Sequence, residues 1–264
     1  MWVSSALRHN VVRNGVGERA MIFAHGFGCD QHMWRFVEPS FRNDFQTILF
    51  DHVGAGGSDI TAYDPLKYSS LGGYADDLVE LCRELGVRNG VFVGHSVSCM
   101  IGLLASLKAP DLFGSQVLVG PSPRYIDDDG YTGGFSAQQI DELLAFLADN
   151  HLAWSQAMAP AIIGNLERPE LAEELTASFC RADPEIAKAF AAVTFRSDNR
   201  ADLAAVIVRT LILQCSEDII APTIVGHYVH DHIASSELVM LAATGHCPNL
   251  SAPQEVIDAI RAFV

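Results

Sequence analysis

The sequence is poor in basic residues. Among its 264 residues, 17 are Lys or Arg and 32 are Asp or Glu, which gives a formal net charge of −15. The basic residues do not form a run, so the field around the protein repels phosphate backbones and anionic lipid surfaces. We therefore expect a protein that binds neither nucleic acid nor a charged membrane surface.

The sequence also lacks a long hydrophobic run. No uncharged segment approaches the roughly 20 apolar residues that a helix needs to span a bilayer. The opening residues, MWVSSALRHN, do not have the basic region and apolar stretch of a signal peptide. We expect a soluble, cytoplasmic protein with no membrane association.

Metal and nucleotide motifs are missing as well. The cysteines are scattered, without CxxC or Cys/His pairs at metal-ligand spacing, so we expect buried reduced thiols and no metal site. The glycine-rich stretch DHVGAGGSD (51–59) has neither GxGxxG spacing nor a Walker lysine, which favours a structural turn. No cofactor is expected. The cysteines are Cys29, Cys82, Cys99, Cys180, Cys215 and Cys247.

Hydrophobic residues make up 49% of the chain, enough for one large core. They occur in short runs of consecutive apolar residues, typical of strands buried on both faces, and these alternate with helical patterns at 74–87, 221–233 and 253–264. This alternation predicts an α/β protein with a mostly parallel sheet. The predicted strands are 20–26, 46–54, 89–95, 114–122, 209–215 and 236–244.

The alternation stops between about Pro121 and Arg200, where several amphipathic helices follow one another without a strand. The block is too long for a loop. We predict a sheet core formed by residues 1–120 and 201–264, and a helical insertion, 121–200, that covers the carboxyl edge of the sheet, where ligands bind in open α/β folds.

A sharp turn interrupts the stretch VFVGHSVSCMIGLLAS (91–106), because a strand pattern becomes a helical pattern with no loop between. A serine on such a turn has an exposed hydroxyl, so Ser96 is the candidate nucleophile. Gly94 and Ser98 provide the small neighbours that the turn requires. Ser98 stands where the usual G-x-S-x-G pattern has its last glycine, and taken alone the motif also fits an ordinary turn.

A catalytic serine needs a histidine base and a carboxylate, which follow it in this order at the ends of late strands. Asp218 in SEDIIAP and His246 in GHCPNLSAP fulfil this requirement. Glu217 is the alternative acid, and His246 could instead end a turn before Pro248. The remaining histidines considered, taken as surface or packing residues, are His9, His32, His52, His151, His227, His230 and His232.

Acyl transfer also needs backbone N–H groups that stabilise an oxyanion. The residue after the nucleophile, Val97, provides one. The loop after the first long strand, FAHGFGCD, provides Phe27 as the second, although a simple strand–helix turn would have the same sequence.

The segments HGFG, DHVGAGGSD, GHSVS, SEDIIAP and GHCPNLS resemble the α/β-hydrolase superfamily over nearly the whole chain. GHSVSCMIGLLAS, VGPSPRYIDDDGYTGGF and FRSDNRADL are most similar to the group of RsbQ and the plant karrikin and strigolactone receptors. The resemblance implies an α/β-hydrolase fold with a V-shaped four-helix cap above an apolar pocket. The implied pocket residues are Phe27, His95, Tyr125, Trp154, Phe195 and Ile219.

Two functions of different classes fit these residues. The first is a serine hydrolase that cleaves small apolar esters or butenolide-type lactones through an acyl-enzyme. The second is a slow-turnover, RsbQ-like ligand sensor that acts through a regulatory protein partner. Dehalogenase and epoxide hydrolase are disfavoured because those relatives have Asp in place of Ser96, whereas a cofactor-free lyase stays open.

Overall fold

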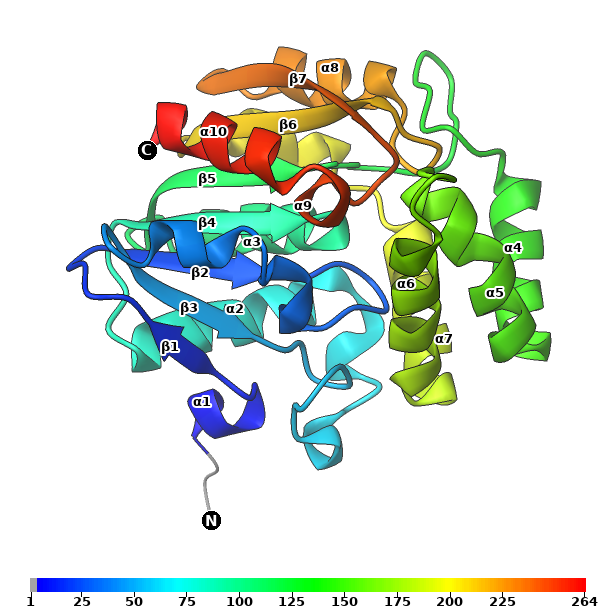
Figure 1. Ribbon diagram of the computed structural model, residues 1–264, viewed down its shortest axis with the longest axis horizontal. Coiled ribbons are helices and arrows are strands. Elements are labelled where there is room, and N and C mark those ends of the chain that lie inside the picture. Colours follow the sequence, from blue (N-terminus) through cyan, green and yellow to red (C-terminus); the bar gives the residue numbers. More distant parts are fainter. Residues whose placement is uncertain (1–3) are drawn as a thin grey trace.

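A seven-stranded β-sheet forms the centre of the computed structural model, which describes residues 4–264 (Figure 1). The strand order is β1-β3-β2-β4-β5-β6-β7; β1 runs antiparallel to β3 and the other neighbours are parallel. The predicted mostly parallel α/β sheet is therefore confirmed. The strands are β1 Val12–Asn14, β2 Ala20–Ala24, β3 Gln46–Phe50, β4 Gly90–His95, β5 Phe113–Val119, β6 Arg209–Glu217 and β7 Ser236–Thr244.

The central strands are apolar on consecutive residues because helices cover both faces. All residues of β2 and β4 are buried. Side chains alternate along β2, so that Met21 and Phe23 belong to one core cluster, and Ile22 and Ala24 to the other. The carboxyl ends of these strands consequently have a rigid position relative to both layers.

Each face of the sheet has its own helices (Figure 1). Residues of α2 (Leu71–Glu84), α3 (Val97–Lys108) and α8 (Thr223–His232) pack in the cluster that contains Ile22. Residues of α10 (Pro253–Phe263) pack on the opposite face with Met21. The short helices are α1 Ser5–Arg8, α9 Pro248–Ser251 and the 3₁₀ turns η1 Gln31–Trp34, η2 Glu38–Phe41, η3 Ile60–Ala62, η4 Lys67–Ser69 and η5 Arg200–Ala205.

Four further helices lie between β5 and β6, beyond the carboxyl ends of the strands (Figure 1). Their boundaries follow local chemistry: Ser136 and Gln139 form a capping box at the first, Gly164 ends the second in a left-handed conformation, and Asp183 caps the last. We call this group the helical insertion. It consists of α4 Ala137–Asp149, α5 His151–Ile163, α6 Pro169–Arg181 and α7 Pro184–Arg196.

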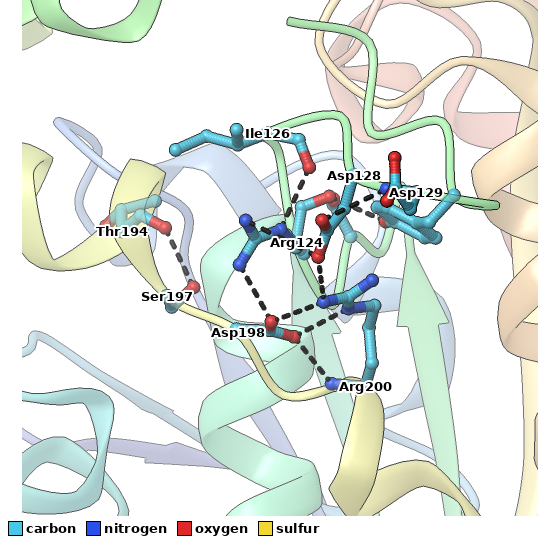
Figure 2. Close-up of polar contacts among 10 residues, drawn as sticks. Arg124, Ile126, Asp128, Asp129, Thr194, Ser197, Asp198 and Arg200 are labelled. Carbon is cyan, nitrogen blue, oxygen red and sulfur yellow. Dashed lines mark hydrogen bonds and ion pairs between the residues drawn. The ribbon is translucent and has the colours of Figure 1, made fainter. Parts of the chain in front are cut away.

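The chain enters and leaves the helical insertion at one place, where four charged side chains connect the two segments (Figure 2). Arg124 on the outgoing segment donates to Asp198 on the returning segment (2.8 Å). Arg200 donates to Asp198 and to Asp128, each at 2.7 Å. The backbone N–H of Asn199 also donates to the carbonyl of Pro123. These contacts fasten the two connections to each other.

Two expectations need correction. Strand β1 was absent from the sequence-based prediction, because its three residues are exposed or half-buried and have no apolar run. The cysteines all lie in the described part of the chain as free thiols, but Cys180 is exposed on α6, and only the other five are buried.

Within residues 4–264, no helix has the length and apolar character that crossing a bilayer requires.

Candidate active site

Ser96 lies at the junction between β4 and α3 in a strained backbone conformation. Its φ of 56° and ψ of −123° are unfavourable for a residue with a side chain and cost about 1–3 kcal/mol. A Cβ on Gly94 would meet the carbonyl oxygen of Ser98 at 2.8 Å, so the helix passes too close for a larger residue. The sharp turn inferred from the sequence is present at this position.

The structure brings Ser96, His246 and Asp218 into one hydrogen-bonded row, although 150 residues separate the serine from the histidine. Nε2 of His246 lies 2.8 Å from Oγ of Ser96, and Nδ1 lies 2.7 Å from Oδ2 of Asp218. All three side chains are buried. With the Nδ1 proton held by the carboxylate, Nε2 is free to accept the serine proton.

Asp218 remains ionised inside the protein because its oxygens are well supplied with donors. Burial alone would raise its pKa, but the charge and hydrogen bond of His246 and the amides of Ile220 and Ala221 outweigh burial and lower it. The alternative acid, Glu217, is exposed at the end of β6. Geometry therefore favours Asp218 over Glu217.

The two backbone amides expected to bind an oxyanion belong to Phe27 and Val97. Val97 is the first residue of α3, where helix N–H groups have no intrahelical acceptor. Phe27 follows β2 in the loop that begins at His25. Among the hydrogen bonds found between residues 4 and 264, none uses the N–H of either residue.

A small cavity of about 30 Å³ adjoins Ser96 and His246. Five of the six predicted pocket residues contribute to its wall: Phe27, His95, Tyr125, Trp154 and Phe195. The ring of Phe27 forms edge contacts with Trp154 and Phe195 at centroid distances of 6.1 Å. The cavity lies between the sheet core and the helical insertion, and its wall is mainly apolar.

Ile219 differs from the expectation. Its side chain is 52% exposed and does not reach the cavity, whereas the neighbouring Ile220 is buried and does. The amides of Ile220 and Ala221 turn toward the Asp218 carboxylate, and this turn leaves Ile219 on the outside.

Sequence reasoning missed more than half of the cavity wall. The additional residues come from α5, α6, α7 and the loops beside the triad, and the only signal in the sequence was the apolar face of each helix. These residues are Cys29, Met158, Ile162, Leu175, Phe179, Thr194, Ile220 and Cys247.

Four polar atoms of the cavity wall have no hydrogen-bond partner in the described chain: the hydroxyls of Tyr125 and Thr194, Nε1 of Trp154 and Nδ1 of His95. Each side chain is almost fully buried. Burial raises the pKa of Tyr125, so its hydroxyl stays protonated. Buried polar atoms normally have a partner, so these atoms are available to hydrogen-bond a bound molecule.

His95 has a different place in the site. Its Nε2 donates to the backbone carbonyl of His246 (2.7 Å), which helps to fix the loop that carries the base. Burial lowers the pKa of His95 to about 3, so this ring is neutral in the folded protein.

A larger cleft of about 520 Å³ lies on the other side of Phe27 and Cys29, between the loop 52–57 and helices α6 and α7. It does not contain Ser96 or His246. Its charged wall residues, such as Asp51 and Glu38, already have donors from the protein. The reactive side chains therefore place the candidate active site in the smaller cavity.

Comparison with known proteins agrees with this geometry. Residues 21–259 match the family model described as "Alpha/beta hydrolase family". The chain belongs to the α/β-hydrolase family. Within it, the chain is 37% identical to karrikin insensitive 2 receptor CA of Petunia hybrida, over 96% of this chain and 94% of the relative.

Two further relatives support the same group. Strigolactone esterase D14 of Arabidopsis thaliana is 35% identical over 98% of this chain and 96% of its own. The solved structure of a hydrolase from Oleispira antarctica superimposes with a TM-score of 0.96 at 37% identity, covering 98% of this chain and 95% of that chain. The predicted resemblance to the karrikin and strigolactone receptor-like group of α/β-hydrolases is confirmed.

Proposed function

We propose that this α/β-hydrolase cleaves small apolar esters or butenolide-type lactones through an acyl-enzyme on Ser96. The observation that carries the proposal is the continuous hydrogen-bonded row from Ser96 through His246 to Asp218, at 2.8 and 2.7 Å. This is the arrangement that turns a weakly nucleophilic hydroxyl into an effective nucleophile.

The reaction follows from the roles of these atoms. Oγ of Ser96 attacks the substrate carbonyl while Nε2 of His246 takes its proton, and the N–H groups of Phe27 and Val97 stabilise the oxyanion. His246 then gives the proton to the departing alkoxide, which leaves an ester on Ser96. A water molecule, activated by the same Nε2, releases the acid and restores the serine. In a lactone the alkoxide stays attached to the acyl group.

The wall of the cavity determines the proposed substrate class. It contains no Lys or Arg side chain, so a charged substrate would lose its hydration without replacement. Tyr125 and Trp154 offer unpartnered donors, which suit a compact apolar molecule with a second oxygen acceptor. Sugars, phosphates and peptides are poor candidates, because this mainly apolar wall would not replace the hydration of their many polar or charged groups.

Replacement of the nucleophile tests the proposal. Ser96→Ala removes one oxygen from the turn, and we expect ester hydrolysis to fall by about 10⁴- to 10⁶-fold with little change in melting temperature. A fluorophosphonate probe should add its mass to the wild type and not to the variant. Ser106→Ala, a buried serine elsewhere on α3, is the control. Near-normal hydrolysis by Ser96→Ala would refute the mechanism.

A second candidate function is a ligand sensor that uses the same site with slow turnover and a regulatory protein partner. It is favoured by the relatives whose names describe receptors, such as karrikin insensitive 2 receptor CA of Petunia hybrida. The turnover number distinguishes the two functions. Ordinary enzymes reach about 1–1000 s⁻¹, whereas a butenolide that shifts the melting temperature but turns over far more slowly would favour the sensor.

A further inference from the structure

Ser98, two residues after the nucleophile, contacts the loop on the opposite side of the site. It is fully buried in the first turn of α3, and its Oγ donates to the carbonyl of His25 at 2.5 Å. Gly26 and Phe27 follow His25 directly in the same loop. The contact thus joins the segment that carries the Val97 amide to the segment that carries the Phe27 amide.

A second histidine fixes the direction of the Ser98 proton. Nε2 of His52 lies 2.8 Å from Oγ of Ser98. The His25 carbonyl can only accept, so the Ser98 proton points to it, and Oγ accepts from the Nε2–H of His52. Burial lowers the pKa of His52 well below its usual value, so the ring is neutral and can donate through Nε2–H.

The loop itself is held by both nitrogens of His25. Its Nε2 accepts from the backbone N–H of His52 at 3.0 Å, and its Nδ1 donates to the carbonyl of Gly26 at 2.8 Å. A Cβ on Gly26 would meet Nδ1 of His95 at 2.5 Å, so the loop has no room to move toward the site. The hydrogen bond from the Ser98 hydroxyl to the His25 carbonyl thus joins this loop directly to α3.

We propose that Ser98 is a positioning residue that sets the separation of the Phe27 and Val97 amides, with His52 holding its hydroxyl in the donating orientation. The inference rests on the proposed function, because it concerns the stabilisation of an oxyanion formed at Ser96. A purely structural serine would affect stability alone. A positioning serine affects the transition state more than substrate binding.

The experiment compares Ser98→Ala with Ser106→Ala. Ser106 is a matched control, since it lies on α3, is equally buried and donates one hydrogen bond to a backbone carbonyl, that of Leu103 (2.7 Å). For hydrolysis of a short-chain p-nitrophenyl ester, we expect Ser98→Ala to lower kcat about 10- to 100-fold with little change in KM. Affinity for phenylboronic acid, which forms a tetrahedral adduct on a reactive serine, should fall by a similar factor.

A double variant separates positioning from folding. Ser98→Ala leaves the buried Nε2–H of His52 unpaired, so its melting temperature should drop. His52→Phe with Ser98→Ala removes that donor, and we expect it to regain stability while kcat and boronate affinity stay low. Recovery of kcat together with stability would overturn the inference.

The remaining outcomes are equally decisive. Ser98→Ala with kcat and boronate affinity within about twofold of the Ser106→Ala control would overturn this inference and leave the proposed function intact, as would a loss confined to KM. Equal activity of the wild type and Ser96→Ala would overturn both.

Discussion

At the scale of single residues, the site retains two features that a stable fold would otherwise avoid. Ser96 has a positive φ, and Asp218 is an ionised carboxylate buried in the interior. The first persists because β4 and α3 leave no other path for the chain. The second is compensated by His246 and by two backbone amides, which together satisfy the carboxylate. The strain at Ser96 has no such compensation, and backbone strain of this kind is typical of functional sites.

Asp218→Asn tests the role of the carboxylate. The amide can hold the imidazole in the wrong tautomer and does not stabilise the imidazolium, so we expect kcat to fall by about 10³- to 10⁴-fold while ligand binding changes little. Steady-state kinetics and ligand-induced melting shifts measure the two effects. Glu217→Gln is the neighbouring control and should be nearly silent; the reverse pattern would assign the acid to Glu217.

At the scale of elements, the strands were predictable because burial on both faces leaves a run of apolar residues. Predicted strands 89–95 and 236–244 correspond to β4 and β7 within one residue. The edge strand β1 has no such run, since one partner, β3, supplies its hydrogen bonds and solvent covers the rest.

In the candidate site, the three polar residues were predictable from the strand pattern and most of the cavity wall was not. Ser96, Asp218 and His246 follow strand ends, and parallel strands bring those ends to one edge. The cavity wall depends instead on how α5 and α6 are rotated against the core. An apolar face at helical spacing does not specify whether Leu175 or a neighbour one turn away meets the cavity, so Leu175 and Phe179 were missed.

The charged cluster at the base of the helical insertion should contribute to stability in a pH-dependent way (Figure 2). Hydrogen bonding to Arg200 lowers the pKa of Asp198 below 3.8. The stabilisation that the ionised Asp198 gives the fold is therefore complete above about pH 4. It disappears as the pH falls through the lowered pKa of Asp198. We expect Arg200→Gln to reduce the free energy of unfolding by at most about 1 kcal/mol at pH 7, less at high salt, and progressively less as the pH falls through the lowered pKa of Asp198.

Thermal melts of wild type and Arg200→Gln at several pH values measure this difference. Arg88→Gln, which removes a single exposed pair with Asp111, is the control and should change the melting temperature less. A difference that stays constant while the pH is lowered below 4 would show that Arg200 acts through packing and not through charge.

At the scale of the whole molecule, the cavity beside Ser96 is small for the proposed substrates. Its 30 Å³ hold about two water molecules. We therefore expect a lactone to enter when the helical insertion moves away from the core. Two ion pairs join α6 to the loops of the core, Arg35 with Glu174 (2.6 Å) and Arg181 with Asp30 (3.1 Å). Both ion pairs are partly exposed, so each contributes little stability and can break when α6 moves away from the core.

Removal of both pairs, as Glu174→Gln with Arg181→Gln, should make the site open more often. Each pair contributes about 0.5 kcal/mol, so the open fraction should rise about fivefold. The rate at which a bulky fluorophosphonate labels Ser96 measures this, and it should increase by a similar factor while a small probe is affected less. Arg196→Gln is the matched control, because it breaks a pair with Asp141 inside the helical insertion. Added salt should accelerate labelling of the wild type and leave the labelling rate of the double variant unchanged. Equal labelling rates in the wild type, the double variant and Arg196→Gln would mean that entry does not require separation of α6 from the core.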